Sequence, residues 1–513
     1  MRDELASPAY RVVVLTLDSH AAGPAERVAP RLSADFPGLE VTVHAAAEWG
    51  ARPDALAEAV EAVERADIVV ANLLFLEEHT RAILPALTAR RDACDAVVGM
   101  IADQSIVKLT RMGDLDMSAP QSAAMKLLKS LRGSAKPNAA SGAKQMKLLR
   151  RLPRILRLIP GKAQDLRAWF LTMQYWLGGS DENIEEMIRF LVGRYADRPD
   201  WQGRRARAPV EYPDVGLYHP DLPGHHLVTE ADAVPGPAEP VATIGLLMLR
   251  SYILSGDCAH YDAVIRAFEA KGIRVLPAFA GGLDGRPAIE AYHMEQVDAL
   301  VSLTGFSLIG GPAYNDSDAA VALLSRLDVP YVAAQPLEFQ TLGQWAASEQ
   351  GLGPIETTML VALPEIDGAT NPTVYAGRHG EDGCRGCAKG CRGGQGKAMA
   401  PCPERIGALV DRTARLATLR RKRNADKTVG VVLFGFPPNA GAAGTAAYLG
   451  VFRSLFHTLH RMAREGYDLD PPESVDALRA AILHGNARQY GQDANVAAHV
   501  GAEEIVAGTP WLK

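Results

Sequence analysis

The sequence lacks the usual marks of membrane insertion and secretion. It contains no apolar run of about 18 residues, the minimum for a membrane-spanning helix. The nearest candidate, residues 244–254, is interrupted by Arg250. The N-terminal residues have neither the basic region nor the long apolar stretch of a signal peptide. We therefore expect a chain that works in the cytoplasm.

Cysteine is scarce, and neither sign of charge dominates. Six cysteines in 513 residues are too few for a disulfide scaffold. A net charge of −6 gives no general attraction to nucleic acid, and we expect no nucleic-acid partner. Hydrophobic residues at 48% and charged residues at 22% are typical of a globular protein, whose length predicts about two to four domains.

A complete nucleotide-binding loop is also missing. The segment 393–398, GGQGKA, has the lysine of a phosphate loop, but Cys391 and Ala398 occupy positions that require glycine and a hydroxyl residue. NAGAAGTAA (439–447) lacks the full dinucleotide fingerprint. We interpret it as a tight strand-to-helix turn, with a loop at Asn439 that closes on a ligand as the functional alternative.

Short β-branched runs alternate with helical patterns in three parts of the chain. The strand-like segments lie at 11–20, 39–45, 66–79, 94–102, 241–249, 273–279, 297–311 and 329–335, and a further one begins at 427. This alternation predicts an α/β protein with several doubly wound parallel-sheet domains and a basic helical or linker insertion.

Parallel sheets of this kind bind ligands beyond the carboxyl ends of their strands. The loops to inspect begin at Asp18, Asn72, Gly305, Gln335 and Phe436. His20, Glu78 and His79 are candidate substrate-side residues there, because acid–histidine pairs bind metals or move protons. Alternatively, Glu78 simply begins a helix, where its charge suits the helix dipole.

One segment is strongly basic. Residues 126–167 contain twelve Lys and Arg against one acid, a net charge of +11. Such a segment can meet an acidic partner, nucleic acid or a membrane surface, and peripheral membrane contact is one expectation. The alternative is a solvated linker whose helical ends pack on the body of the protein.

Four cysteines gather in the segment 382–405. Cys384, Cys387, Cys391 and Cys402 have the spacing C-x2-C-x3-C-x10-C, and proline follows the last one. This pattern favours a four-iron iron–sulfur cluster. Structural zinc, no metal and a disulfide remain the alternatives.

Several long motifs carry a family resemblance. They are VVLTLDSH, ADIVVANLLFLEEHTRAILPAL, KLTRMG, QDLRAWFLTMQYWLGGSDENIEEMIRFLVGRYA, LLMLRSYILSGDCAHYDAVIRAFEAKG, LTGFSLIGGPAYND, PLEFQTLGQW and FGFPPNAGAAGTAAYLGVF. Together they resemble the N-terminal portion of the porphyrin-binding H subunit of magnesium chelatase, in its bacteriochlorophyll-making branch. The resemblance extends from about residue 10 to about residue 500.

The resemblance implies a ligase component that binds protoporphyrin IX and presents it for Mg²⁺ insertion. It also implies AAA+ partner subunits of the I and D types, which hydrolyse ATP, and the following methyltransferase as a further partner. No catalytic residue is carried over, because we expect those residues beyond Lys513. We expect the chain to be a fragment, a truncated product or a split subunit.

The same resemblance predicts two domains. An N-terminal H-subunit domain spans 1–170 and includes the basic segment. The first part of a CobN/magnesium chelatase domain spans 171–513, with a helical link (171–235), an α/β part (241–375), a Cys-rich loop (376–405) and the start of another α/β part (427–513). The rival interpretations are a cobaltochelatase-like large subunit and a non-catalytic tetrapyrrole-binding or redox-sensing module.

Overall fold

The chain forms two compact units, Met1–Ala417 and Thr418–Lys513. The computed structural model describes residues 9–17, 19–50, 52–118, 152–161, 163–311, 314–380, 383–387, 390–392, 398–433, 444, 446, 448–486 and 498–509. Two sheets, both in the first unit, account for nearly all of the buried core.

The first sheet is parallel at its centre. Its strands lie in the order β2 (Leu39–Ala45), β1 (Tyr10–Thr16), β3 (Ile68–Asn72), β4 (Ala96–Met100), β5 (Arg111–Met112) and β6 (Leu115–Asp116). β2, β1, β3 and β4 pair in parallel, whereas β5 and β6 add an antiparallel edge. β3 and β4 are buried throughout, as expected for strands covered on both faces.

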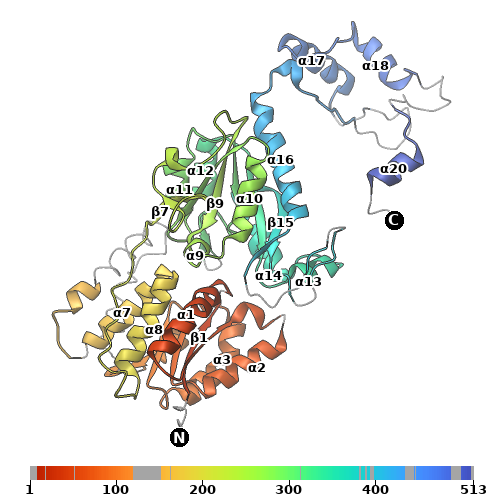
Figure 1. The fold of residues 1–513 in the computed structure, drawn as a ribbon. Helices are drawn as coiled ribbons and strands as arrows, with labels where there is room; N and C mark the ends of the chain where they lie inside the picture. The colour runs from red at the N-terminus through yellow and green to blue at the C-terminus, as the bar shows by residue number, and fades with distance from the viewer. Residues whose placement is uncertain are drawn as a thin grey trace. The chain divides into compact units, whose positions relative to one another are not determined.

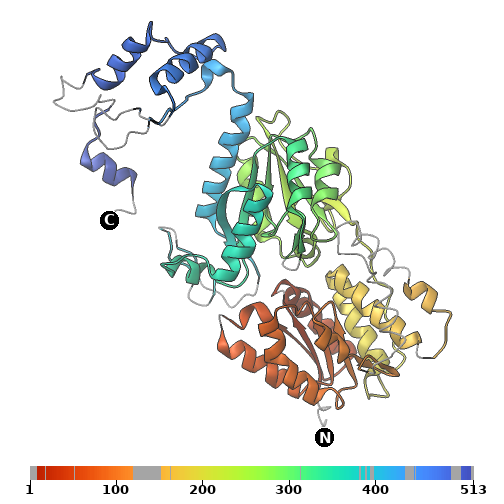
Figure 2. The same ribbon diagram turned by 180° about the vertical axis from the view of Figure 1, so that it is seen from behind.

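Helices cover both faces of this sheet (Figure 1). One face packs against α1 (Ala22–Asp35), α7 (Ala163–Gly178) and α8 (Asp181–Tyr195). The other face packs against α2 (Pro53–Glu64), α3 (Glu77–Arg90) and α4 (Gln104–Lys108). The reverse view in Figure 2 shows the same two layers.

The second sheet has a parallel centre and antiparallel edges on both sides. Its strands lie in the order β16 (Ala400–Pro401), β15 (Thr370–Gly377), β14 (Tyr331–Leu337), β11 (Ala299–Ser302), β9 (Thr243–Leu249), β10 (Arg274–Ala280), β7 (Val215–Tyr218) and β8 (Leu227–Val228). β15, β14, β11, β9 and β10 pair in parallel. The predicted α/β alternation is therefore confirmed, with antiparallel edges as an addition.

Helices again lie on both faces of the second sheet. α10 (Ala259–Glu269) and α16 (Pro403–Arg421) cover one face, and α11 (Arg286–Tyr292) and α12 (Ser317–Leu327) cover the other (Figure 1). The remaining elements are η1 (Ser19–Ala21), η2 (Ala46–Glu48), η3 (Ala231–Ala233), α9 (Arg250–Leu254), β12 (Gly310–Gly311), β13 (Tyr314–Asn315), α13 (Leu342–Ala347), α14 (Pro354–Glu356), the π-helical η4 (Thr357–Ala362) and α15 (Leu363–Asp367).

The structure shifts one boundary expected from the sequence and agrees with another expectation. The predicted helical link at 171–235 is α-helical only in its first part, because α8 ends at Tyr195 and β7 and β8 then join the second sheet. Within the basic segment, the described stretch 152–161 begins with a helical turn. Leu152 and Leu156 of this turn are buried in the first core, in agreement with a helical end that packs on the body.

The second unit does not contain the strand expected from residue 427. Residues 427–433 form no ladder in the described part of this unit, and Val432 is 93% exposed. A buried parallel strand requires neighbours on both sides, and the described residues of this unit supply helices: η5 (Asn424–Asp426), α17 (Val451–Arg464), α18 (Val475–Leu483) and α20 (Ala502–Gly508). None of the helices in the described ranges is both long and apolar enough to cross a membrane.

Candidate functional site

A cavity of about 330 Å³ lies where the carboxyl ends of the two sheets meet in the first unit. This volume is at the lower end of the range of about 300–1,000 Å³ for small-molecule sites. Its lining comprises Leu17, His20, Ala21, Ala47, Leu73, Phe75, Trp176, Leu177, Gly179, Ile184, Leu249, Arg250, Ser251, Tyr252, Leu254, Ser255, Ala280, Gly281, Gly282, Leu283, Phe306, Glu338, Phe339 and Met359. The cavity therefore lies where doubly wound folds generally bind ligands, beyond the carboxyl ends of their strands.

The first sheet contributes one wall of this cavity. His20 follows β1, and Leu73 and Phe75 follow β3. Leu73 has a φ of 55°, a left-handed conformation that is uncommon for leucine and that tends to cluster at functional sites. Trp176, near the end of α7, extends this wall. Phe75 is 53% exposed, so its ring is open to a ligand.

The second sheet contributes the opposite wall. Tyr252 lies in α9 directly after β9, and Leu283 follows β10. Phe306 and Phe339 follow β11 and β14. Aromatic rings on both walls, together with aliphatic side chains, suit a flat apolar ligand.

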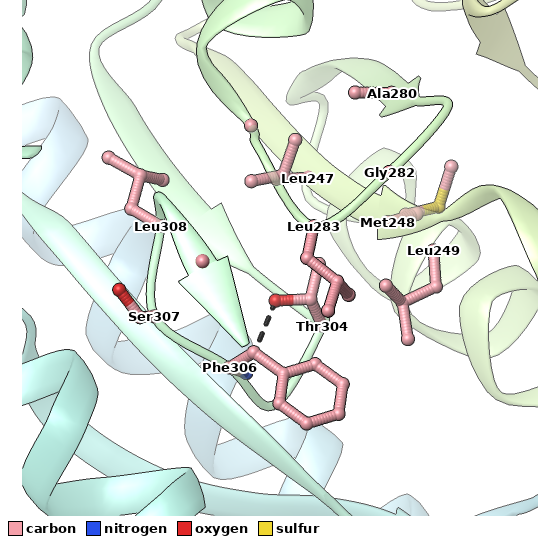
Figure 3. A pocket seen from close by; sticks show the side chains of 12 residues that line it. Leu247, Met248, Leu249, Ala280, Gly282, Leu283, Thr304, Phe306, Ser307 and Leu308 are labelled. Atoms are coloured by element: carbon pink, nitrogen blue, oxygen red, sulfur yellow. Dashed lines mark hydrogen bonds between the residues drawn. The ribbon is translucent and has the colours of Figure 1, made fainter. Parts of the chain in front are cut away.

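A smaller hollow adjoins this wall (Figure 3). Its volume is about 20 Å³, room for about one water molecule. Phe306 N–H donates to the Thr304 hydroxyl at 3.4 Å, which holds the turn that presents the Phe306 ring. Gly305, between them, has a φ of 69°, and a β-carbon there would lie 2.9 Å from Pro336. This turn therefore requires glycine.

Three polar side chains from separate elements meet at one side of the cavity. The His20 and Tyr252 rings lie 4.5 Å apart between centroids. The Tyr252 hydroxyl donates to the carboxylate of Glu338. Burial lowers the pKa of His20, while the charges of Glu338 and Asp257 oppose that shift. His20 is therefore a neutral base at physiological pH, with carboxylates placed to stabilise its protonated form.

A cation also lines the cavity. The guanidinium of Arg250 donates to the carbonyls of Pro213 at 2.8 Å, Tyr212 at 3.1 Å and Leu177 at 3.3 Å. These three bonds hold the side chain in one position, and the guanidinium keeps its proton throughout the physiological pH range. Arg250 therefore brings a fixed cationic group to the wall of the cavity.

An ion pair fixes the two walls together. Arg378 follows β15 and reaches Glu48 of η2 at 3.0 Å, with both side chains less than a tenth exposed. The same guanidinium donates to the backbone carbonyl of Glu338 at 2.6 Å. The position of Glu338 in the cavity therefore depends on a contact between the two sheets.

The structure brings only some of the predicted residues to the cavity. His20 lines it, whereas Glu78 is exposed in the first turn of α3 and His79 is buried against Trp49, with ring centroids 5.6 Å apart. The helix-start interpretation of Glu78 therefore agrees with the structure. Asn439, together with Asp18 and Phe436, lies outside the described residues.

Two predicted loop positions belong to strands. Asn72 is the last residue of β3, is fully buried, and its amide has no hydrogen-bond partner among the described residues. Gln335 lies inside β14 and donates to the carbonyls of Ala333 and Leu360. The loop expected at Gln335 begins at Glu338, since β14 continues to Leu337.

The structure brings three of the four clustered cysteines together. Cys384 and Cys391 face each other through two backbone hydrogen bonds, and both pack with Cys402 in one apolar cluster. Burial raises the thiol pKa of Cys391 and of Cys402, which disfavours the thiolate that binds metal. Across the described residues, no three His, Cys, Asp or Glu side chains form a group that could hold a metal ion. The described residues therefore show no assembled metal site at these cysteines.

Sequence reasoning missed Tyr252, Glu338 and Trp176. Tyr252 follows a strand that was recognised, so the rule for strand ends could have indicated it. Glu338 was missed because the expected loop began three residues too early. Trp176 lies on a helix, and no local pattern distinguishes it from a core residue.

Comparison with known families gives two matches. Residues 173–509 match the family described as CobN/Magnesium Chelatase. Residues 11–170 match a domain of unknown function.

Similar proteins include the H subunit of the magnesium chelatase of Cereibacter sphaeroides, which is 64% identical over 99% of this chain. The corresponding protein of Rhodobacter capsulatus is 64% identical over 98% of this chain. The chain spans 43% of the length of each of these relatives. The aerobic cobaltochelatase subunit CobN of Pseudomonas aeruginosa is 28% identical over 60% of this chain and 24% of its own.

A solved structure shares the fold. The catalytic subunit of cobaltochelatase from Mycobacterium tuberculosis superposes with a TM-score of 0.51 and 20% identity. The match covers 94% of this chain and 33% of that one.

Proposed function

Because this chain belongs to the CobN/magnesium chelatase family, we propose that it is the porphyrin-binding portion of a magnesium chelatase H subunit. Its role is to hold protoporphyrin IX while Mg²⁺ is inserted in bacteriochlorophyll synthesis. The observation that carries this proposal is the 64% identity to the H subunit of Cereibacter sphaeroides over 99% of the chain. Identity to cobaltochelatase subunits is much lower, at 28% for that of Pseudomonas aeruginosa, which favours magnesium over cobalt.

The cavity supports a porphyrin ligand. A porphyrin is a flat apolar ring with carboxylate side chains, and it requires aromatic or aliphatic walls and a cation. Trp176 and Phe75 on one wall and Phe306 and Phe339 on the other supply aromatic surface. Arg250 supplies positive charge for a carboxylate.

The energy for insertion comes from partner subunits in this proposal. The sequence has no complete phosphate loop, so AAA+ subunits of the I and D types hydrolyse ATP. Mg²⁺ is a substrate that loses its tightly held water as it enters the ring. The complex works in the cytoplasm, with the following methyltransferase as the acceptor of Mg-porphyrin and peripheral membrane contact through the basic segment.

Titration of the purified chain with protoporphyrin IX tests this function. We expect a shift of the porphyrin Soret band and quenching of tryptophan fluorescence. Phe75→Ala should weaken binding about tenfold, because one aromatic contact contributes about 0.5–1.5 kcal/mol beyond its buried area. The control is Tyr448→Ala, an exposed aromatic of the second unit. Absence of binding by the unmodified chain contradicts the proposal.

A non-catalytic tetrapyrrole carrier is the second candidate function, because the largely apolar lining of the cavity suits binding alone. A carrier binds porphyrin but forms no Mg-porphyrin when partner subunits, ATP and Mg²⁺ are added. Formation of Mg-porphyrin under those conditions excludes the carrier role.

The Cys-rich loop carries a separate proposal, in which Cys384, Cys387, Cys391 and Cys402 take up an iron–sulfur cluster for redox sensing. The cysteine spacing and the shared apolar cluster support it. Anaerobically purified chain should contain about four iron atoms, lost in Cys387→Ser and retained in Cys94→Ser. An iron-free preparation excludes the cluster.

A further inference from the structure

Metal insertion into a porphyrin releases two protons. Each pyrrole N–H bond that breaks leaves its electron pair for a nitrogen–metal bond, and its proton needs an acceptor. Water can accept these protons, but a base positioned over the ring makes the transfer faster, so a cavity that accelerates insertion should combine such bases with apolar walls.

The polar side of the cavity has the composition of such an acceptor. His20 and Glu338 are on its lining, one from the end of β1 and the other from the end of β14. Tyr252 lies between them, with its ring 4.5 Å from the imidazole and its hydroxyl on the carboxylate. Tyr252 is 3% exposed, so both contacts are held inside the protein.

We propose that His20 and Glu338 are the proton acceptors for metal insertion, and that Tyr252 is the positioning residue that holds them. This inference rests on the proposed porphyrin site and deepens it. The imidazole of His20 takes one pyrrole proton and becomes imidazolium. The carboxylate of Glu338 takes the other and becomes a carboxylic acid, so the two N–H bonds broken balance the two protons accepted.

The surroundings of His20 support its role as a neutral base. Burial lowers its pKa, and the charges of Glu338 and Asp257 raise it. Asp257 accepts from the Met399 amide at 3.1 Å, and burial raises the pKa of this carboxyl. The positive charge of Arg27 lowers the pKa of Asp257. Arg27 itself forms an ion pair with Asp181 at 2.7 Å.

A second histidine lies behind Tyr252. The His260 ring is 5.2 Å from the Tyr252 ring and is fully buried, and it is not part of the cavity lining. Burial lowers its pKa to about 3. His260 therefore stays neutral over the working pH range and adds no charge beside His20.

The test measures Zn²⁺ insertion into porphyrin bound to the purified chain. Zn²⁺ enters free porphyrins without ATP, so this assay requires no partner subunit. The variants are His20→Asn, Glu338→Gln and Tyr252→Phe. His44→Asn is the matched control, because His44 lies in β2 outside the cavity lining and contacts Thr42 at 3.2 Å.

We expect His20→Asn to slow insertion at pH 7.5 at least about tenfold, since positioned bases contribute about 10²–10⁴-fold. Its porphyrin Kd should stay within about twofold of the unmodified chain, because the apolar walls remain. Glu338→Gln and Tyr252→Phe should slow insertion less, and His44→Asn should have no effect. Thermal melting identifies any variant that fails to fold. Tyr252→Phe should disturb the fold least, because it removes only the hydroxyl and keeps the ring.

The pH profile separates a base from a structural residue. In the unmodified chain the insertion rate should stay constant from pH 8 to about 6.5 and fall at lower pH, as His20 becomes protonated. His20→Asn should lose this dependence. Equal rates for His20→Asn and the unmodified chain overturn the proposal, as does bound porphyrin that excludes Zn²⁺. Failure of the chain to bind porphyrin instead overturns the proposed function.

Discussion

Arg378 and Glu48 form a buried ion pair between the two sheets of the first unit. Removing one member of a buried pair leaves the other charge without compensation, at a cost of about 3–5 kcal/mol. Glu48 also contacts Arg52 at 3.4 Å, so we expect Arg378→Leu to cost about 3 kcal/mol, near the lower limit of that range.

Chemical denaturation of a double-mutant cycle measures this effect. Arg378→Leu combined with Glu48→Leu should recover part of the loss, because no charge remains buried. Arg326→Leu is the control, since its contact with Glu290 is exposed. Additive effects of the two substitutions would contradict a coupled pair.

His293 and His260 make stability depend on pH. Burial lowers the pKa of His293 to about 4 and that of His260 to about 3. In the unfolded chain their pKa is near the ordinary value of about 6.5. Between these values the unfolded chain binds protons that the folded chain does not, so the free energy of unfolding falls as the pH decreases from 7 to 4.

Each of these histidines should contribute up to about 1.4 kcal/mol per pH unit in that window. The His293 ring donates to the Leu276 carbonyl at 2.9 Å, and glutamine can keep this contact. We expect His293→Gln to have a smaller slope of unfolding free energy against pH than the unmodified chain. An unchanged slope in His293→Gln would show that this histidine titrates normally.

At the scale of elements, α8 is fixed by its first residues. Ser180 is the N-terminal cap of this helix, and its hydroxyl accepts a hydrogen bond from the backbone N–H of Asn183. The Asn183 side chain in turn bonds both backbone groups of Val210. α8 supplies Ile184 to the cavity wall, so this cap supports the candidate site as well as the fold.

Ser180→Ala should destabilise the first unit by about 1 kcal/mol, the usual effect of losing a helix cap. Ser474 provides a matched control, because its hydroxyl caps α18 of the second unit at 3.0 Å from the Ala477 nitrogen. Thermal unfolding should show a lower midpoint for Ser180→Ala alone. Equal shifts for both variants would contradict a local role for this cap.

At the scale of the whole molecule, the cavity belongs to the first unit. All residues that line it precede residue 418, and Leu478 is the one buried hydrophobic residue among the described residues of the second unit. A fragment of residues 1–427 should therefore keep its melting midpoint within about 2 °C and its porphyrin Kd within about twofold.

Calorimetry and porphyrin titration of that fragment check this prediction. A matched fragment, residues 1–399, removes α16, whose Ile406, Leu409 and Val410 are buried in the second core. It should lose several kcal/mol of stability. Loss of porphyrin binding in the longer fragment would show that the second unit contributes to the site.

Local sequence patterns were sufficient to predict the α/β class and most of the central strands. Runs such as 11–16 and 243–249 are continuous and apolar because both faces of each strand are covered, and that feature is visible without a structure. The strand expected from residue 427 was wrong for the described residues because pairing depends on neighbours, which a local pattern does not show.

The sequence by itself determined the family, the fold class and His20 as a candidate. Only the tertiary structure decided that His20, Tyr252 and Glu338 meet, and that Glu78 and His79 lie elsewhere. The physical reason is that hydrophobic periodicity acts over a few residues, whereas this cavity forms from strand ends more than 300 residues apart. Their encounter depends on how two separate cores pack against each other.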